Sequence, residues 1–426
     1  SAYRQAIELA PAFIQPHFNL GLVFERQGRH DEAVEQWRWV EEHASAEKPD
    51  ERAILVSALN SIGRLQESRR KFGDAVAALE KSLLLNPEQS DTIHHWVFIR
   101  QKMCAWPVYA DLGAVSPEQM KAATSALAML SLSDDPQAQL AAAQSYSMRK
   151  IPKNLPVLAP KASYGHSKLR IAYLSSDFCL HPVSMLTAEL FELHDRSKFE
   201  VYGFCWSPED GSALRKRVMG AMDHFIQINA LNDAEAAQLI RDNEIDILID
   251  LHGQTRGARP VILAYRPALV QITYLGLPAT TGLPCVDYVI ADRFLIPEEY
   301  AQFYSEKPLY MPDIYQVSDR KRLCSPPPAR KSCGLPETGF VFSSFNNNHK
   351  FTPEIFSVWM RILQRVPQSV LWLLADNEWA ESNMREEAVS RGVDPARLVF
   401  AYRTAPEAYL ARYLLAASMP PLRRPD

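Results

Sequence analysis

The stretch of sequence that decides the fold runs from residue 169 to residue 182 and reads LRIAYLSSDFCLHP. It begins with the mostly apolar run Leu169–Ser175, continues as a short polar loop, and leads into the helix-patterned stretch Met185–His194. A near-continuous apolar run is typical of a strand buried on both faces, as in a parallel sheet. The order of strand, polar loop and helix therefore predicts the start of a doubly wound α/β domain.

The same alternation continues along the chain in two series. The first series predicts strands at Phe199–Trp206, His224–Ile228, Asp246–Leu251, Val270–Leu275 and Asp287–Ala291. The second series predicts only three strands, Phe340–Phe345, Ser369–Ala375 and Leu398–Ala401, with helices over 353–365, 379–391 and 406–415. The loop Ser318–Lys331, with its three consecutive prolines, separates them. We expect two open α/β domains whose ligand sites lie at the carboxyl ends of their strands.

An internal repeat precedes these domains. The positions that match the 34-residue tetratricopeptide pattern are Leu20, Gly21, Phe24, Ala33 and Trp37, and then Ile62, Gly63, Ala75 and Leu79. Tyr3, Ala6 and Pro11 fit the second helix of one more unit. The two glycines are further apart than the repeat period, and we expect the extra residues near Glu41–Asp50 to form a loop. The stretch Thr92–Met103 is interpreted as a capping helix.

Composition excludes several classes of protein. The 426 residues include 47% hydrophobic and 23% charged residues, which is ordinary globular usage. The net charge of −4 argues against a basic nucleic-acid surface, and no apolar run reaches the length of a membrane helix. The six cysteines contain no C-x-x-C pair, so a zinc site or a disulfide framework is not expected. A reducing cytoplasm fits this usage.

Three polar clusters follow predicted strands. In the first, Asp177 and His181 lie four residues apart on one loop, where both can face a cleft; the alternative is a helix-capping Asp and a structural His. The second cluster is the stretch 250–257, whose two glycines permit close approach of a ligand and whose Arg256 can meet an anion; the alternative is a tight turn.

The third cluster runs from a strand into a helix over residues 345–354. Thr352 is a suitable N-cap and Pro353 a suitable first helical residue, so the helix start and Lys350 together predict a diphosphate site. The alternative is a capped helix without a ligand. The chain has neither a G-x-G-x-x-G motif nor a Walker-type glycine–lysine motif, which disfavours standard dinucleotide-binding and ATPase functions.

Taken together, the motifs resemble the O-GlcNAc transferase family, glycosyltransferase family 41, in its bacterial Spindly-like form. The resemblance covers nearly the whole chain. The segments that carry it are 169–178 with His181-Pro182, 253–259, 274–278 with Thr281-Gly282, 304–307, 310–312, Phe345-Asn346 with Lys350, and 365–374.

The resemblance implies a tetratricopeptide solenoid followed by two Rossmann-like domains of the GT-B type. The expected parts are the repeats and capping helix (1–103), a helical segment and linker (104–168), the acceptor-side catalytic domain (169–317) and a partial nucleotide-sugar-binding domain (332–426). It also implies inverting, metal-independent transfer of N-acetylglucosamine from UDP-GlcNAc to Ser or Thr hydroxyls of proteins, with no cofactor. Protein substrates are expected on the solenoid, and neither nucleic acid nor a membrane is an expected partner.

The resemblance also assigns roles to residues. Asp177, His181 and Lys350 are expected to be catalytic, with Lys350 holding the leaving diphosphate. Pro182, Leu275, Gly276, Asn347 and Lys350 are expected to bind the donor. At Leu180, Asn347 and His349 the chain departs from the residues of animal enzymes.

The end of the chain, Ser418–Asp426, does not match the continuation that the family pattern predicts. We therefore expect the sequence to be cut at both ends and the second sheet to keep an unpaired edge. Two other functions stay open. One is a relative that uses another donor, such as GDP-fucose, and the other is a repeat-bearing binding module whose transferase domain has decayed.

Overall fold

The computed structural model describes residues 2–159 and 162–418. The chain forms two compact units. One unit combines the segment up to Thr124 with the segment from Cys324 onward, and the other comprises Ser125–Leu323. The N-terminal helices therefore share a unit with the second sheet, and the predicted segment 104–168 is divided between the two units.

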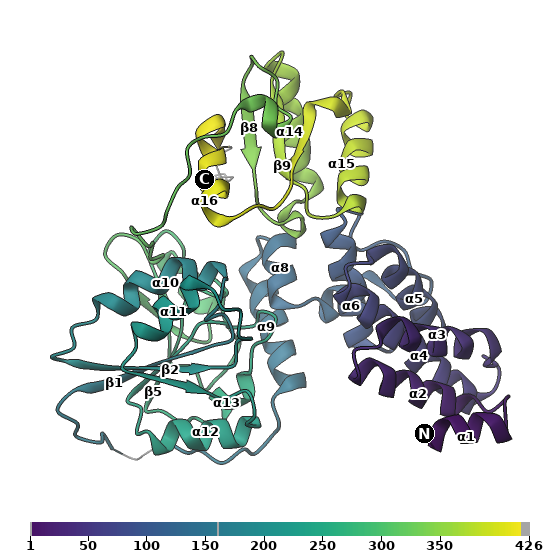
Figure 1. Cartoon of the computed structure of the whole chain (residues 1–426), viewed down its shortest axis with the longest axis horizontal. Coiled ribbons are helices and arrows are strands. Elements are labelled where there is room, and N and C mark those ends of the chain that lie inside the picture. Colours follow the sequence, from purple (N-terminus) through teal and green to yellow (C-terminus); the bar gives the residue numbers. More distant parts are fainter. Residues whose placement is uncertain (1, 160–161, 419–426) are drawn as a thin grey trace. The chain divides into compact units, whose positions relative to one another are not determined.

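The N-terminal segment is a series of helices in which each packs against the next (Figure 1). Their bounds are α1 Ala2–Leu9, α2 Ile14–Arg26, α3 His30–His43, α4 Pro49–Ser68, α5 Phe72–Leu85, α6 Ser90–Lys102 and α7 Pro117–Ala123. The predicted repeat positions face the interfaces. Trp37 of α3 is fully buried and lies where a side chain on Gly21 of α2 would be, and Leu79 stands in the same relation to Gly63. The helical hairpins and the helix expected near Thr92–Met103 are confirmed.

The loop expected over Glu41–Asp50 is wrong in its extent. Helix α3 continues to His43, only residues 44–48 connect, and α4 then begins at Pro49 and runs for 20 residues. Proline suits the first turn of a helix because its missing N–H would have no partner there, and Asp50 and Glu51 favour the positive helix start. Most of the extra residues therefore lengthen α4.

The second sheet, in the same unit, is parallel and has the order β10-β9-β8-β11. Its strands are β8 Val341–Ser344, β9 Val370–Leu374, β10 Leu398–Ala401 and β11 Ala417–Ser418. Its helices are η2 Arg330–Cys333, η3 Asn348–Lys350, α14 Pro353–Arg365, α15 Glu378–Ser390, η4 Pro395–Arg397, α16 Pro406–Arg412 and η5 Tyr413–Leu415.

The prediction of three strands is wrong in number for this sheet. Its unpaired edge remains among the described residues, because β10 and β11 each pair with a strand on one side alone. The backbone of Ala417 and Ser418 pairs with Phe342 and Ser343 of β8, so β8 has neighbours on both sides. Backbone N–H and C=O groups at a sheet edge gain from such pairing. A strand of two residues is too short to show a periodic pattern, which is why the sequence did not reveal it.

The unit Ser125–Leu323 is built on a seven-stranded parallel sheet with the order β3-β2-β1-β4-β5-β6-β7. Its strands are β1 Leu169–Ser175, β2 Phe199–Cys205, β3 His224–Gln227, β4 Ile247–Asp250, β5 Val270–Thr273, β6 Tyr288–Ala291 and β7 Lys307–Tyr310. Its helices are α8 Ala126–Leu132, α9 Pro136–Lys150, α10 Pro182–Leu193, α11 Ala213–Gly220, α12 Asp233–Asp242, α13 Pro260–Ala264 and η1 Glu298–Phe303. The six predicted strands are confirmed, and β7 is additional.

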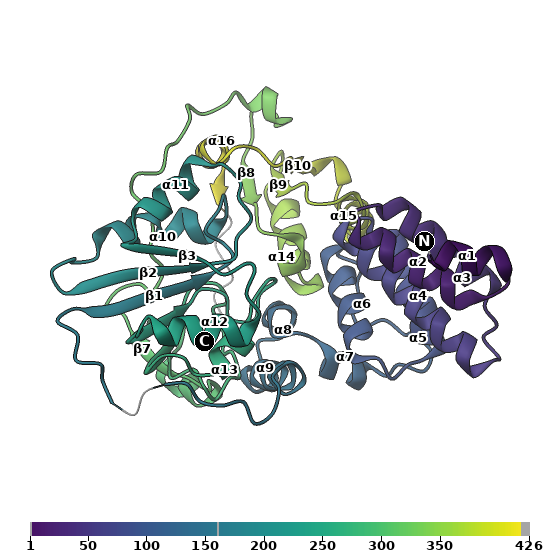
Figure 2. The same cartoon turned by 60° about the horizontal axis from the view of Figure 1, so that its bottom comes forward.

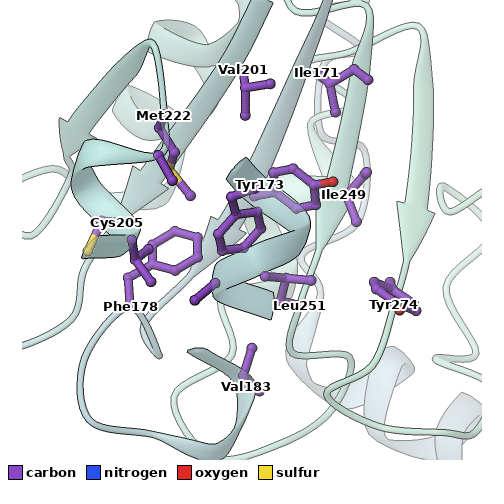
Figure 3. Packing of buried hydrophobic residues seen from close by; sticks show 14 of the residues in the cluster. Ile171, Tyr173, Phe178, Val183, Val201, Cys205, Met222, Ile249, Leu251 and Tyr274 are labelled. Atoms are coloured by element: carbon purple, nitrogen blue, oxygen red, sulfur yellow. The ribbon is translucent and has the colours of Figure 1, made fainter. Parts of the chain in front are cut away.

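Helices cover both faces of this sheet: α10 and α11 lie on one face, and α12 and α13 on the other (Figure 2). On the first face, Phe178 packs edge-to-face on Phe191 of α10, and Tyr173 of β1 lies against the same ring. Figure 3 shows Tyr173 and Phe178 within this cluster of buried side chains. Phe178 is fully buried although it belongs to the polar loop after β1. It therefore anchors the middle of that loop in the core.

In the part of the chain that the structure describes, no helix is long and apolar enough to cross a membrane. This agrees with the absence of a long apolar run in the sequence.

The packing of Gly21 gives a first prediction. Because a Cβ at this position would overlap the Trp37 indole, Gly21→Ala should lower the free energy of unfolding by about 1–3 kcal/mol. Gly220→Ala is the matched control, since a Cβ at the end of α11 meets nothing within 4 Å. Urea denaturation followed by circular dichroism measures both. Equal stability of the two variants would contradict close packing at Gly21.

Candidate active site

The first group of candidate residues lies at the carboxyl ends of β1 and β4. These two strands pair in parallel register, with Leu174 opposite Asp250, and Leu251 N–H donates to Leu174 O at 3.1 Å. Since β1 leads outward to β2 and β3 while β4 leads to the other half of the sheet, the chain changes direction between them. In doubly wound sheets such a switch point is where ligands bind.

His252, directly after β4, joins the two loops. Its side chain is fully buried, and its Nε2 accepts a hydrogen bond from the Ser176 backbone N–H at 2.8 Å. The proton of the neutral ring therefore sits on Nδ1, which lies 3.0 Å from Thr255 Oγ1 and 3.7 Å from Asp177 Oδ2. Burial lowers the pKa of His252 below its usual range, so the ring is neutral at physiological pH. The sequence analysis passed over this residue in favour of the neighbouring glycines and Arg256, which is exposed.

Asp177 and His181 lie together, as expected. The Asp177 carboxylate is 3.4 Å from His181 Nδ1, and its side chain is only 16% exposed, against 42% for His181. The same Nδ1 lies 3.3 Å from the Val183 backbone N–H at the start of α10. His181 is thus both the N-cap of a helix and the partner of a carboxylate. Its Nε2 has no hydrogen-bond partner among the described residues.

Asp250, the last residue of β4, is fully buried beneath this group. Its carboxylate accepts hydrogen bonds from the backbone N–H groups of Gly253 at 2.7 Å and His252 at 3.3 Å. Burial raises the pKa of Asp250 to about 7, against the effect of these hydrogen bonds, and the charge of Asp177 adds to the rise. A carboxyl group with such a raised pKa is typical of a functional site.

Leu275 and Gly276 follow β5, the next strand in the sheet. Leu275 has φ = +70°, and Gly276 N–H donates to Tyr274 O at 2.8 Å, so the chain makes a tight, strained turn. A side chain on Gly276 would overlap the carbonyl oxygen of Leu251. The turn after β5 therefore rests directly on the loop after β4. Pro182, also expected at the donor, is the first residue of α10.

The second group lies at the carboxyl end of β8, in the other unit. Lys350 ends the short helix η3, is exposed, and its Nζ lies 3.5 Å from Asn346 Oδ1. Asn347 precedes η3 and accepts from Arg403 Nη2 at 3.3 Å. Helix α14 then starts at Pro353, with Thr352 Oγ1 accepting from Ile355 N–H as predicted for an N-cap.

Helix α6 of the N-terminal series supports the turn that carries Lys350. Gln101 Nε2 donates to His349 O at 2.7 Å, and Cys104, just after α6, directs its thiol to Asn348 O at 3.6 Å. Burial raises the pKa of the Cys104 thiol, so it remains a donor. Burial and the nearby lysines Lys350 and Lys102 lower the pKa of His349 to about 4, so its ring adds no charge beside Lys350.

Comparison with known proteins places the chain in a family. The sequence profile of glycosyl transferase family 41 matches residues 138–326 and 327–419, which is more than half of the chain.

The chain belongs to glycosyl transferase family 41.

Two curated relatives illustrate the membership. The chain is 39% identical over 271 residues to the probable UDP-N-acetylglucosamine–peptide N-acetylglucosaminyltransferase SEC of Arabidopsis thaliana, an alignment that covers 62% of this chain and 27% of SEC. It is 26% identical over 362 residues to the UDP-N-acetylglucosamine–peptide N-acetylglucosaminyltransferase of Caenorhabditis elegans, covering 58% and 32%. The chain thus spans about a third or less of the length of these relatives.

A solved structure of a Thermobaculum terrenum O-GlcNAc transferase mutant has the same fold, with a TM-score of 0.65 and 24% sequence identity. The match covers 96% of this chain and 71% of that chain. The predicted fold class, helices followed by two Rossmann-like parallel sheets, is therefore confirmed.

In this family 41 chain the predicted site residues form two groups. One group follows the carboxyl ends of strands in the seven-stranded sheet and comprises Asp177, His181, Pro182, Leu275 and Gly276. The other follows the carboxyl end of β8 in the four-stranded sheet and comprises Asn347 and Lys350. Among residues 2–159 and 162–418, no three His, Cys, Asp or Glu side chains are arranged to hold a metal ion.

The buried Asp250 predicts a pH-dependent stability. The folded protein holds this proton more tightly than the unfolded chain, whose aspartate titrates near 3.8. The free energy of unfolding should therefore fall as the pH rises from about 4 to about 7, by at most ~1.4 kcal/mol per pH unit. Asp250→Asn should flatten this slope, whereas Asp242→Asn, an exposed control on α12, should not. Urea denaturation at several pH values measures it, and an unchanged slope in Asp250→Asn would place the titration elsewhere.

Proposed function

We propose that this chain is the catalytic portion of a protein O-GlcNAc transferase, which transfers N-acetylglucosamine from UDP-GlcNAc to Ser or Thr hydroxyls of proteins. The proposal is supported by family membership and by the names of the relatives. One observation carries it: within the matched residues, a carboxylate–imidazole pair ends a strand of one sheet, and a lysine precedes a capped helix after a strand of the other.

In the proposed reaction, the acceptor hydroxyl oxygen attacks the anomeric carbon and the bond from that carbon to the diphosphate oxygen breaks. The configuration is inverted, UDP leaves with the bonding electron pair, and the hydroxyl proton passes to a base. The Asp177–His181 pair is the candidate for proton transfer, because the His181 side chain is 42% exposed and its Nδ1 lies beside the carboxylate. Lys350 and the first N–H groups of α14 stabilise the negative charge that develops on the diphosphate.

This division of roles needs neither a metal ion nor a cofactor, because the charge on the leaving group is met by Lys350 and backbone N–H groups. The proposed partners are protein substrates, bound along the N-terminal helices, where stacked helical hairpins offer an extended surface. All six cysteines are free, which supports a reducing compartment such as the cytoplasm.

A radiolabelled-donor assay tests the proposal. Purified chain is incubated with UDP-GlcNAc or with GDP-fucose and a Ser/Thr-containing peptide library, and binding of each nucleotide is measured by calorimetry. Label from UDP-GlcNAc in the peptides supports the proposed transferase. Binding and transfer with GDP-fucose alone would replace the donor, and saturable binding of neither nucleotide sugar would favour a binding module.

Lys350 should matter for donor chemistry rather than for folding. The side chain is exposed and lies 3.5 Å from Asn346 Oδ1, so Lys350→Met should leave the melting temperature nearly unchanged. Transfer should fall by about 100-fold or more, since a single preorganised donor contributes on that order. Lys331→Met, which removes an exposed lysine of η2, is the matched control. Full transfer by Lys350→Met would remove this lysine from the mechanism.

His181 has a structural and a proposed chemical role, and two variants separate them. His181→Ala loses both the imidazole and the cap of α10, so transfer should fall strongly and stability by about 1 kcal/mol. His181→Asn keeps a good N-cap but cannot exchange a proton near neutral pH, so stability should return while transfer stays low. Recovery of transfer in His181→Asn would show that the imidazole acts only as a cap.

A further inference from the structure

A second cation lies beside Asn347, two residues after β10. The guanidinium of Arg403 donates through Nη2 to Asp376 Oδ1 at 2.8 Å and to Asn347 Oδ1 at 3.3 Å. Because β9 lies between β10 and β8 in the sheet, Arg403 reaches across the end of β9 to contact the turn after β8. No pattern in the sequence singles out this residue.

The side-chain oxygens of two consecutive asparagines therefore each lie beside one cation. Asn346 Oδ1 faces Lys350 Nζ, and Asn347 Oδ1 faces Arg403 Nη2. Lysine and arginine side chains have only donors, so both amide oxygens point at the cations. Neighbouring Cα atoms are about 3.8 Å apart, so the anchoring places both cations at one turn.

The Arg403 side chain is 64% exposed, and its Nε and Nη1 groups have no hydrogen-bond partner among the described residues. A guanidinium presents its donors in a planar fork that matches two oxygens of a phosphate. Arg403 is therefore held at one corner while its other donors remain available for a ligand.

Asp376, after β9, holds the Nη2 end of the Arg403 guanidinium in place. Its side chain is only 9% exposed and is met from two sides, by Arg403 and by Arg70 from the turn between α4 and α5. Arg70 Nη2 also donates to the Asp376 backbone oxygen at 2.5 Å. Although burial acts in the opposite direction, the hydrogen bond from Arg403 and the charge of Arg70 lower the pKa of Asp376, which therefore stays ionised.

Among these side chains, positive charges outnumber negative ones. Two cations, Arg403 and Arg70, meet the Asp376 carboxylate. A third, Lys350, lies beside Asn346, and the neighbouring His349 is neutral. Because the Arg403 side chain is largely exposed, water screens its ion pair with Asp376, and the pair contributes little to stability. The excess positive charge is better explained by an anionic ligand than by folding.

We propose that Arg403 is a second diphosphate-binding residue, which contacts the donor together with Lys350, and that Asp376 is its positioning residue. This inference rests on the proposed function, because it assumes a nucleoside diphosphate at the turn that carries Lys350. It adds a specific requirement: affinity for the diphosphate depends on a residue after β10, whereas affinity for the nucleoside does not.

Calorimetry of the full chain with UDP and with uridine tests this requirement. Arg403→Gln should weaken UDP binding about tenfold or more and leave uridine binding unchanged. The UDP affinity of Arg403→Lys should lie between those of Arg403→Gln and the unchanged chain, because lysine keeps the charge but not the planar fork. Asp376→Asn should weaken UDP binding severalfold and leave uridine binding unchanged. The matched control is Arg365→Gln, which removes an exposed arginine at the far end of α14 and should bind UDP as the unchanged chain does.

Salt supplies a second readout, since the difference between Arg403→Gln and the unchanged chain should shrink in 0.5 M NaCl if it is electrostatic. The inference is overturned if Arg403→Gln binds UDP as well as Arg365→Gln does, or if it loses uridine and UDP in equal proportion. When Lys350→Met weakens UDP binding and Arg403→Gln does not, only this inference fails. If the unchanged chain binds no UDP at all, the proposed function fails with it.

Discussion

The parallel register of neighbouring strands is the constraint on which both groups of residues depend. The pairing of Leu174 with Asp250 places the loop after β1 beside the loop after β4, although 75 residues of chain separate them in sequence. Only in this register can the Ser176 N–H reach His252 Nε2 and the Asp177 carboxylate approach the same ring. A slip of one residue would turn the side chains of the strand to the opposite face and separate these groups.

Strand register brings the loops after β1 and β4 together, and buried groups then fix the position of the loop backbone. Phe178 sits in the core between Asp177 and His181, its N–H donates to Ser207 Oγ at 2.9 Å, and its carbonyl accepts from the buried Arg215 at 2.6 Å. Gln101 plays the same part for the turn of Lys350. Polar side chains on loops can be held in fixed positions only when the backbone between them is fixed.

Much of this arrangement was predictable from the sequence, because long apolar strands and strand-end polar clusters leave clear patterns. The six strands of the first series, the N-cap at Thr352 and the position of Asp177 and His181 on one loop after a strand all followed from such patterns. Strand β7 did not, since Lys307–Tyr310 is short, contains a proline and lies at an edge where alternate residues are exposed. His252 and Arg403 were missed for another reason: their roles come from contacts with residues distant in sequence, Ser176 and Asp376, which no local pattern records.

The two groups differ in charge in a way that fits different chemical tasks. At the first sheet, burial leaves His252 neutral and raises the pKa of Asp250 to about 7. The carboxylate that faces His181 is that of Asp177. Such a group suits the proton transfer proposed for it. At the second sheet, Arg403 pairs with Asp376 and Lys350 lies beside Asn346, and the pKa of the neighbouring His349 is lowered to about 4. That group suits the diphosphate binding proposed for it, and its neutral imidazole does not take up a proton near neutral pH. An inverting transfer needs both tasks, so neither sheet alone carries the proposed reaction.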